Sequence, residues 1–94
     1  MNEIKKKIPL VCPSCDSTLQ VAKMHCNACG TEVNGCYDLP LLARLPEKEQ
    51  LFILEFVKSS GSLKDMARQL EISYPTIRNL LDDLIEKLKK MESQ

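Results

Sequence analysis

The 94-residue sequence lacks an excess of positive charge, because its 13 basic and 13 acidic side chains cancel. From residue 38 onward it is slightly acidic, with nine Lys and Arg against ten Asp and Glu. Non-specific nucleic-acid binding depends on basic side chains that neutralise phosphates. A protein that holds nucleic acid through bulk charge alone is therefore excluded, and any such binding needs local charge patterning, a dimer, or both. The run of Lys5, Lys6 and Lys7 is interpreted as a solvated end, with a phosphate-contacting arm as the alternative.

The sequence also lacks a long apolar run and a recognisable catalytic arrangement, and we expect no secretory leader. No apolar run approaches the roughly 18 residues that a membrane-spanning helix needs. Residues 8–12 are too short for a secretory core, and no cleavage-like small residues follow them. We therefore expect a cytoplasmic protein. No nucleophile and base occur in a recognisable arrangement, so we do not expect an enzyme.

Four cysteines stand out in what is present. They form two Cys-x-x-Cys pairs, Cys12 with Cys15 and Cys26 with Cys29, with ten residues between the pairs. Two such turns at this separation can place four thiolates around one tetrahedral Zn²⁺. Gly30 follows the second pair and suits the positive φ that such a turn needs. A chain this short buries only a modest core, so a structural metal is a natural supplement.

The cysteines also have other interpretations. Disulfides would need an oxidising compartment, which nothing in the sequence supports. A redox Cys-x-x-Cys normally occurs once, at the start of a helix. A rubredoxin-like iron site also uses four thiolates, although zinc is favoured in a structural role. A four-cysteine site leaves no position for water or substrate. Cys36 is interpreted as a small apolar strand residue. His25 could compete as a ligand, but a complete cysteine set leaves it either on the surface or in contact with the metal ligands.

The segments around the cysteines have strand patterns. Residues 18–23 alternate as in a strand. Residues 31–33 and 36–38 flank Asn34 and Gly35, a dipeptide that favours a type I′ hairpin turn. Together these features predict a zinc ribbon over residues 1–38. Residues 39–46 are apolar rather than rich in Gly and Ser, which predicts a packed linker.

The helical half begins at Pro46, which we predict to be the first residue of a helix that ends at Lys58 or Ser59 and is closed by residues 60–61. The apolar residues of this helix cover nearly its whole circumference, which predicts burial on more than one side. One side should face the other helices, and the second side needs the ribbon, another subunit or a partner protein. The apolar residues are Leu51, Phe52, Ile53, Leu54, Phe56 and Val57.

Residues 62–88 have the pattern of a helix-turn-helix. Leu63, Met66, Ala67 and Leu70 lie on one face of a short helix, with Ser62 as its N-cap. Residues 71–73 form the turn, where Glu71 occupies a position that usually holds Gly, at an expected cost of about 1 kcal/mol. Ser73 caps the next helix, and Ile77, Leu81 and Leu84 face back onto the first one.

The second helix of such a unit lies in the DNA major groove, with its N-terminal residues against the base edges. Arg and Asn side chains are suited to reading guanine and adenine. The predicted DNA-binding residues are the outward ones at the start of this helix: Ser73, Tyr74, Pro75, Thr76, Arg78 and Asn79. The alternative is that the two helices only pack against each other.

Beyond this region the helix continues an apolar heptad seam through Leu84, Leu88 and Met91. The seam predicts dimerisation through the first and last helices. The alternative is a single helix that frays after Lys87.

Residues 45–88 are similar to the promoter-reading fourth region of bacterial sigma factors and to LuxR-type domains. The whole chain, with its two cysteine pairs and the segment SYPTIRN at residues 73–79, resembles an uncharacterised bacterial family, number 2089 among the domains of unknown function. That family is regarded as zinc-ribbon DNA-binding regulators. The resemblance implies that Cys12, Cys15, Cys26 and Cys29 are zinc ligands and that Tyr74, Pro75, Thr76, Arg78 and Asn79 are presented by a recognition helix.

We therefore predict a small α+β protein, in which a four-cysteine zinc ribbon built from β-hairpins packs on an all-α helix-turn-helix domain at residues 47–94. The leading hypothesis is a homodimeric DNA-binding transcription regulator with one structural zinc ion and a recognition helix over about residues 74–88. The alternative is a protein-interaction adaptor for RNA polymerase or a sigma factor. The neutral charge and the acidic pair Asp82 and Asp83 motivate this alternative.

Overall fold

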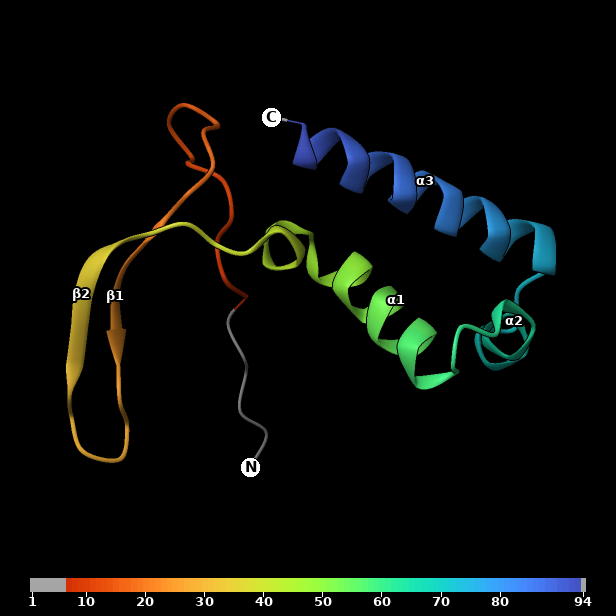
Figure 1. The fold of residues 1–94 in the computed structure, drawn as a ribbon, viewed down its shortest axis with the longest axis horizontal. Coiled ribbons are helices and arrows are strands. Elements are labelled where there is room, and N and C mark those ends of the chain that lie inside the picture. Colours follow the sequence, from red (N-terminus) through yellow and green to blue (C-terminus); the bar gives the residue numbers. More distant parts are fainter. Residues whose placement is uncertain (1–6, 94) are drawn as a thin grey trace. The chain divides into compact units, whose positions relative to one another are not determined.

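The computed structural model describes residues 7–93, so Lys5 and Lys6 of the lysine run lie outside the described residues. The chain forms two compact units, one ending at Pro40 and the other beginning at Leu41 (Figure 1). Two antiparallel strands lie in the first unit and three α-helices in the second. This order of elements confirms the predicted small α+β fold.

The first unit is built around one β-hairpin. Strands β1 (Val21–His25) and β2 (Glu32–Tyr37) pair in antiparallel register, with His25 opposite Glu32 and Val21 opposite Tyr37. An isolated bridge joins Val11 to Thr18 on either side of the first cysteine turn. No residue from 7 to 40 is buried. The hairpin therefore has no apolar core within residues 7–40, and its stability must come from another source.

The predicted type I′ turn at Asn34 and Gly35 is wrong. Both residues lie inside β2, and neither has the positive φ that this turn requires. The hairpin instead reverses through residues 26–31, which form the second cysteine turn. Lys23 is opposite Asn34, and the register shifts between Lys23 and Val21. Gly35 instead leaves room for the ring of Tyr37, because a Cβ atom at position 35 would lie only 2.7 Å from that ring.

The second unit starts with a 3-10 helix, η1 (Leu41–Arg44), which is followed by α1 (Glu47–Lys58). Pro46 is the N-cap of α1 rather than its first helical residue, a difference of one position. Leu45 is fully buried, so the end of the predicted linker belongs to the helical core. The Gln50 side chain donates a hydrogen bond to the Leu45 carbonyl at 2.8 Å and ties this segment to α1.

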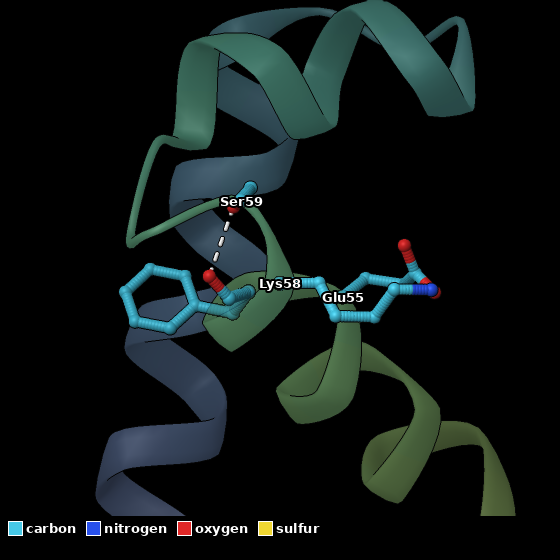
Figure 2. A network of polar contacts seen from close by, with 4 residues as sticks. Glu55, Lys58 and Ser59 are labelled. Atoms are coloured by element: carbon cyan, nitrogen blue, oxygen red, sulfur yellow. Dashed lines mark hydrogen bonds and ion pairs between the residues drawn. The ribbon is translucent and has the colours of Figure 1, made fainter.

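Helix α1 ends at Lys58, as the sequence predicts. Ser60 and Gly61 both adopt positive φ, of 58° and 81°, which turns the chain away from the helix axis. The Ser59 hydroxyl donates to the Phe56 carbonyl at 2.9 Å, and Lys58 pairs with Glu55 at 3.4 Å (Figure 2). The Phe56 carbonyl in the last turn of the helix thereby gains a hydrogen-bond donor, and the start of the loop to the next helix is held against α1.

The core of the second unit lies between α1, α2 (Leu63–Leu70) and α3 (Tyr74–Glu92). Its buried residues come from the faces predicted by the apolar periodicity, and Phe52, Phe56, Ile72 and Leu81 pack against them partly buried. The buried members of this cluster are Leu63, Met66, Ala67 and Ile77, and Leu45 and Leu84 are also buried in the unit. Leu70, which was predicted on the same face of α2, is 48% exposed.

Helix α1 contributes no fully buried residue to this core. Its inner face is half-buried, whereas Leu51, Leu54 and Val57 on the outer face are 52%, 51% and 68% exposed. We predicted that two sides of this helix are covered. Among the described residues, only the inner side is covered. Helix α3 runs to Glu92, so the alternative of fraying after Lys87 is wrong.

Candidate metal centre and nucleic-acid interface

The two cysteine turns have the same backbone structure. In the first, the Cys12 N–H donates to the Ser17 carbonyl at 2.8 Å and the Asp16 N–H donates to the Cys12 carbonyl at 2.9 Å. In the second, Cys26 and Thr31 repeat the first bond at 2.8 Å, and the Gly30 N–H donates to the Cys26 carbonyl at 2.8 Å. The turns are therefore repeats of one motif.

The residue after each second cysteine is left-handed, as the motif requires. Asp16 has a φ of 63° and Gly30 a φ of 79°. Asp tolerates this conformation better than most side chains because its short polar group can bond locally. Asp16 and Gly30 therefore hold matching positions in the two turns. A sequence comparison of the two turns with each other is enough to predict this pairing.

Hydroxyl groups accompany the second thiol of each turn. The Cys15 sulfur lies 3.3 Å from the Ser17 hydroxyl, and the Cys29 sulfur lies 3.0 Å from the Thr31 hydroxyl. These side-chain hydrogen bonds are the largest cause of a lowered pKa for Cys15 and for Cys29. Hydrogen bonds with the backbone of Ser17 and Thr31 lower the pKa of each thiol further. A lower pKa favours the thiolate, which is the form that binds metal. Sequence reasoning missed Ser17 and Thr31, although their equivalent positions in the two turns were a visible signal.

The described residues do not bring the four cysteines together. The second cysteine turn, residues 26–31, joins β1 to β2 at the tip of the hairpin, whereas the first, residues 12–17, precedes β1 near the opposite end of the strands (Figure 1). Within residues 7–93 no three His, Cys, Asp or Glu side chains form a group that could hold a metal ion. Each turn on its own offers two thiols, and this donor chemistry fits zinc. The structure therefore contains two half-sites.

Cys36 lies in β2, as predicted for a strand residue, but its side chain is exposed and polar in its contacts. Its thiol donates to the Gln20 side-chain oxygen at 2.8 Å, and the Gln20 amide donates to Asp38 at 2.5 Å. Nothing in the sequence pattern singled out Gln20. His25 is exposed on β1, in agreement with its interpretation as a surface residue.

The helix-turn-helix has the predicted caps. The Ser62 hydroxyl accepts a hydrogen bond from the Asp65 N–H at 3.1 Å, and the Ser73 hydroxyl accepts one from the Thr76 N–H at 3.3 Å. Glu71 ends α2 in the left-handed conformation, with a φ of 57° and a ψ of 39°. The turn thus has the geometry that favours Gly, and Glu71 adopts it at the expected cost of about 1 kcal/mol.

All six predicted DNA-binding residues are exposed. Ser73 and Thr76 share a hydroxyl–hydroxyl hydrogen bond of 2.7 Å in the cap, so they hold the helix start in place. Tyr74 is half-exposed at the first helical position. Arg78 pairs with Asp82 one turn further on, at 3.4 Å. Tyr74, Arg78 and Asn79 are therefore the side chains best placed to reach outward.

Two family models match the chain. The model described as "Domain of unknown function (DUF2089)-HTH" covers residues 45–91, and the "DUF2089 zinc ribbon" covers residues 12–43. The chain belongs to the DUF2089 family. Its zinc-ribbon match includes both cysteine turns, and its helix-turn-helix match includes α1, α2 and nearly all of α3. No curated protein and no solved structure matches the chain.

Membership in the DUF2089 family gives the two units their coarse roles. The ribbon indicates zinc binding, and the combination of ribbon and helix-turn-helix indicates a nucleic-acid-binding role. Among residues 7–93, no helix has both the length and the apolar character needed to cross a membrane.

Proposed function

We propose that this DUF2089 protein is a non-catalytic, cytoplasmic, DNA-binding transcription regulator that inserts α3 into the major groove. The capped turn before α3 carries the proposal: it is held by Ser73 and Thr76 and exposes Tyr74, Arg78 and Asn79. In helix-turn-helix proteins this end of the second helix contacts base edges. The buried Ile77 and Leu84 anchor the opposite face of α3, so its outward residues have a defined direction.

The ion pair of Arg78 is weak enough for a contact with DNA to replace it. Arg78 and Asp82 are each 52% exposed and lie 3.4 Å apart. An exposed pair of this kind contributes only about 0–1 kcal/mol. The Arg78 guanidinium can therefore leave Asp82 for a guanine at little cost, and a bidentate contact to guanine is worth about 1–3 kcal/mol of discrimination. Asp82 meanwhile disfavours unspecific approach to phosphates.

We further propose that the two cysteine turns close on one structural zinc ion per chain, which would be held by Cys12, Cys15, Cys26 and Cys29. This requires the two half-sites, which lie apart in the structure, to come together. When bound, zinc cross-links thiolates and lends no open coordination position. The residues of this chain prepare for that role in two ways. The left-handed Asp16 and Gly30 shape the turns, and the hydroxyls of Ser17 and Thr31 lower the pKa of the adjacent thiols.

Fluorescence anisotropy tests DNA binding, with the zinc-loaded protein titrated onto its own upstream DNA and onto a scrambled duplex over a series of salt concentrations. We expect a preference for the native duplex that weakens with salt, because released counterions drive the phosphate contribution. Arg78→Ala should remove about 1–3 kcal/mol of sequence-selective binding. Lys58→Ala removes one positive charge from α1 and serves as the matched control. Equal selectivity for Arg78→Ala and the parent protein would exclude Arg78 as a base reader.

A second candidate function is a protein-interaction adaptor for RNA polymerase or a sigma factor. The exposed outer face of α1, with Leu51, Leu54 and Val57, favours it, because exposed apolar side chains that gather on one face often mark protein-binding surfaces. A stoichiometric complex with purified polymerase or sigma factor, together with no binding to any DNA duplex, would favour the adaptor and reject the DNA-binding regulator.

We also propose a homodimer through α1 and α3. Its support is the exposed face of α1 and the exposure of Ile85 on α3. Sedimentation velocity should give the mass of two chains, and Leu54→Glu should shift it to one chain by placing a charge in the interface. Glu55→Gln, on the same helix, is the control. A monomer at all concentrations of the parent protein would reject the dimer.

A further inference from the structure

A cleft of about 290 Å³ lies between α1 and α3. Its apolar lining comes from Phe52 on α1 and from Leu80 and Leu84 on α3. The volume lies just below the roughly 300–1,000 Å³ that is usual for ligand sites. The cleft can therefore accommodate only a small molecule with a compact apolar body.

One wall of the cleft is fixed by an ion pair between the two helices. The Lys87 ammonium donates to one carboxylate oxygen of Glu49 at 2.8 Å. The second oxygen of Glu49 is buried and accepts no hydrogen bond from any described residue. This oxygen is closed off from solvent, so the Glu49–Lys87 pair acts as a fixed wall and leaves ligand contacts to the exposed charges.

The remaining two charges at the cleft have opposite signs and come from opposite helices. Lys48 lies on α1 and Asp83 on α3, and both line the cleft. Neither forms an ion pair or a side-chain hydrogen bond with another residue in the range 7–93. The cleft thus offers one unpaired cation and one unpaired anion beside an apolar surface.

We propose that this cleft binds a small zwitterion with an apolar body, for which an α-amino acid with a branched aliphatic side chain is the simplest candidate. The ligand carboxylate pairs with Lys48, and its ammonium donates to Asp83. The aliphatic side chain covers Phe52 and Leu84. This binding does not depend on DNA, so the two proposals can fail separately.

Isothermal titration calorimetry of the zinc-loaded full chain tests the proposal with L-leucine as the probe. We expect saturable binding with a dissociation constant that is millimolar or tighter. Isopentylamine and isocaproate carry the same apolar body with only the ammonium or only the carboxylate. Each should bind at least about tenfold more weakly, a difference of about 1.4 kcal/mol. Equal binding of the three probes, or no saturable binding of leucine, overturns the proposal.

Variants locate the site. Lys48→Met and Asp83→Asn replace exposed charges with side chains of similar size, so the fold should be unaffected and circular dichroism verifies it. Each should weaken leucine binding about tenfold or more. Lys58→Met, on α1 but outside the cleft, is the matched control and should leave binding unchanged. Loss of binding in the control as well would place the leucine elsewhere and overturn the assignment.

Discussion

Chelation of the metal should unfold the first unit while the helices of the second remain. The hairpin of residues 7–40 has no buried residue, so little apolar burial opposes its unfolding. In small zinc modules the binding free energy of the ion is the folding free energy, with apparent values of about 10–16 kcal/mol at neutral pH. This is the largest effect that we predict for the protein.

Amide resonances measured by NMR separate the two units in one experiment. After addition of EDTA, the dispersed signals of β1 and β2 should collapse, whereas those of α2 and α3 should stay. Cys26→Ser should have the same effect without chelator. Cys36→Ser is the matched control, because Cys36 lies outside both turns and a serine hydroxyl can still donate to Gln20. Metal analysis should find one zinc per chain. A dispersed hairpin spectrum in EDTA would contradict the structural role of the metal.

Ile77→Ala should produce the largest loss of stability in the helical unit. Ile77 is fully buried on α3 and packs in the core with Leu63, Met66 and Ala67 from α2. Truncation of a buried Ile to Ala leaves a cavity and costs about 2–5 kcal/mol. Small domains have a total stability of only about 5–15 kcal/mol, so a large share of the folding free energy would be lost.

Urea denaturation followed by far-ultraviolet circular dichroism measures this loss. Ile77→Val removes one methylene and should cost about 0.5–1.5 kcal/mol, which gives a graded series. Leu70→Ala is the matched control, because Leu70 on α2 is 48% exposed and surface changes usually stay within about 0.5 kcal/mol. A similar midpoint for Ile77→Ala and Leu70→Ala would mean that α3 does not pack on α2 as described.

The local signals in the sequence were sufficient for the helices. Ser62 and Ser73 act as caps because their hydroxyls bond N–H groups only three residues away, an interaction within one helical turn. The buried faces of α2 and α3 follow from a period of 3.6 residues, which a single chain displays directly. The irregular position at Glu71 was also predicted, because the length of the turn requires a left-handed residue there.

The hairpin shows where local signals are insufficient. Asn34 and Gly35 have the composition of a tight turn, but the reversal occurs at the cysteine turn of residues 26–31. The choice between the two reversals depends on strand pairing and on the contact of Gly35 with the ring of Tyr37. These contacts join residues through the sheet and through space, and a dipeptide preference does not contain them.

The sequence by itself determined the family, the two cysteine turns, the helix boundaries and the outward face of α3, because each depends on spacing within a few residues. Only the tertiary structure decided which side of α1 is covered, where the hairpin reverses, and that Lys48 and Asp83 flank an apolar cleft with the Glu49–Lys87 pair. These features join residues up to 38 positions apart. Their energies arise from strand pairing and from packing between helices, which join segments that a local pattern does not connect.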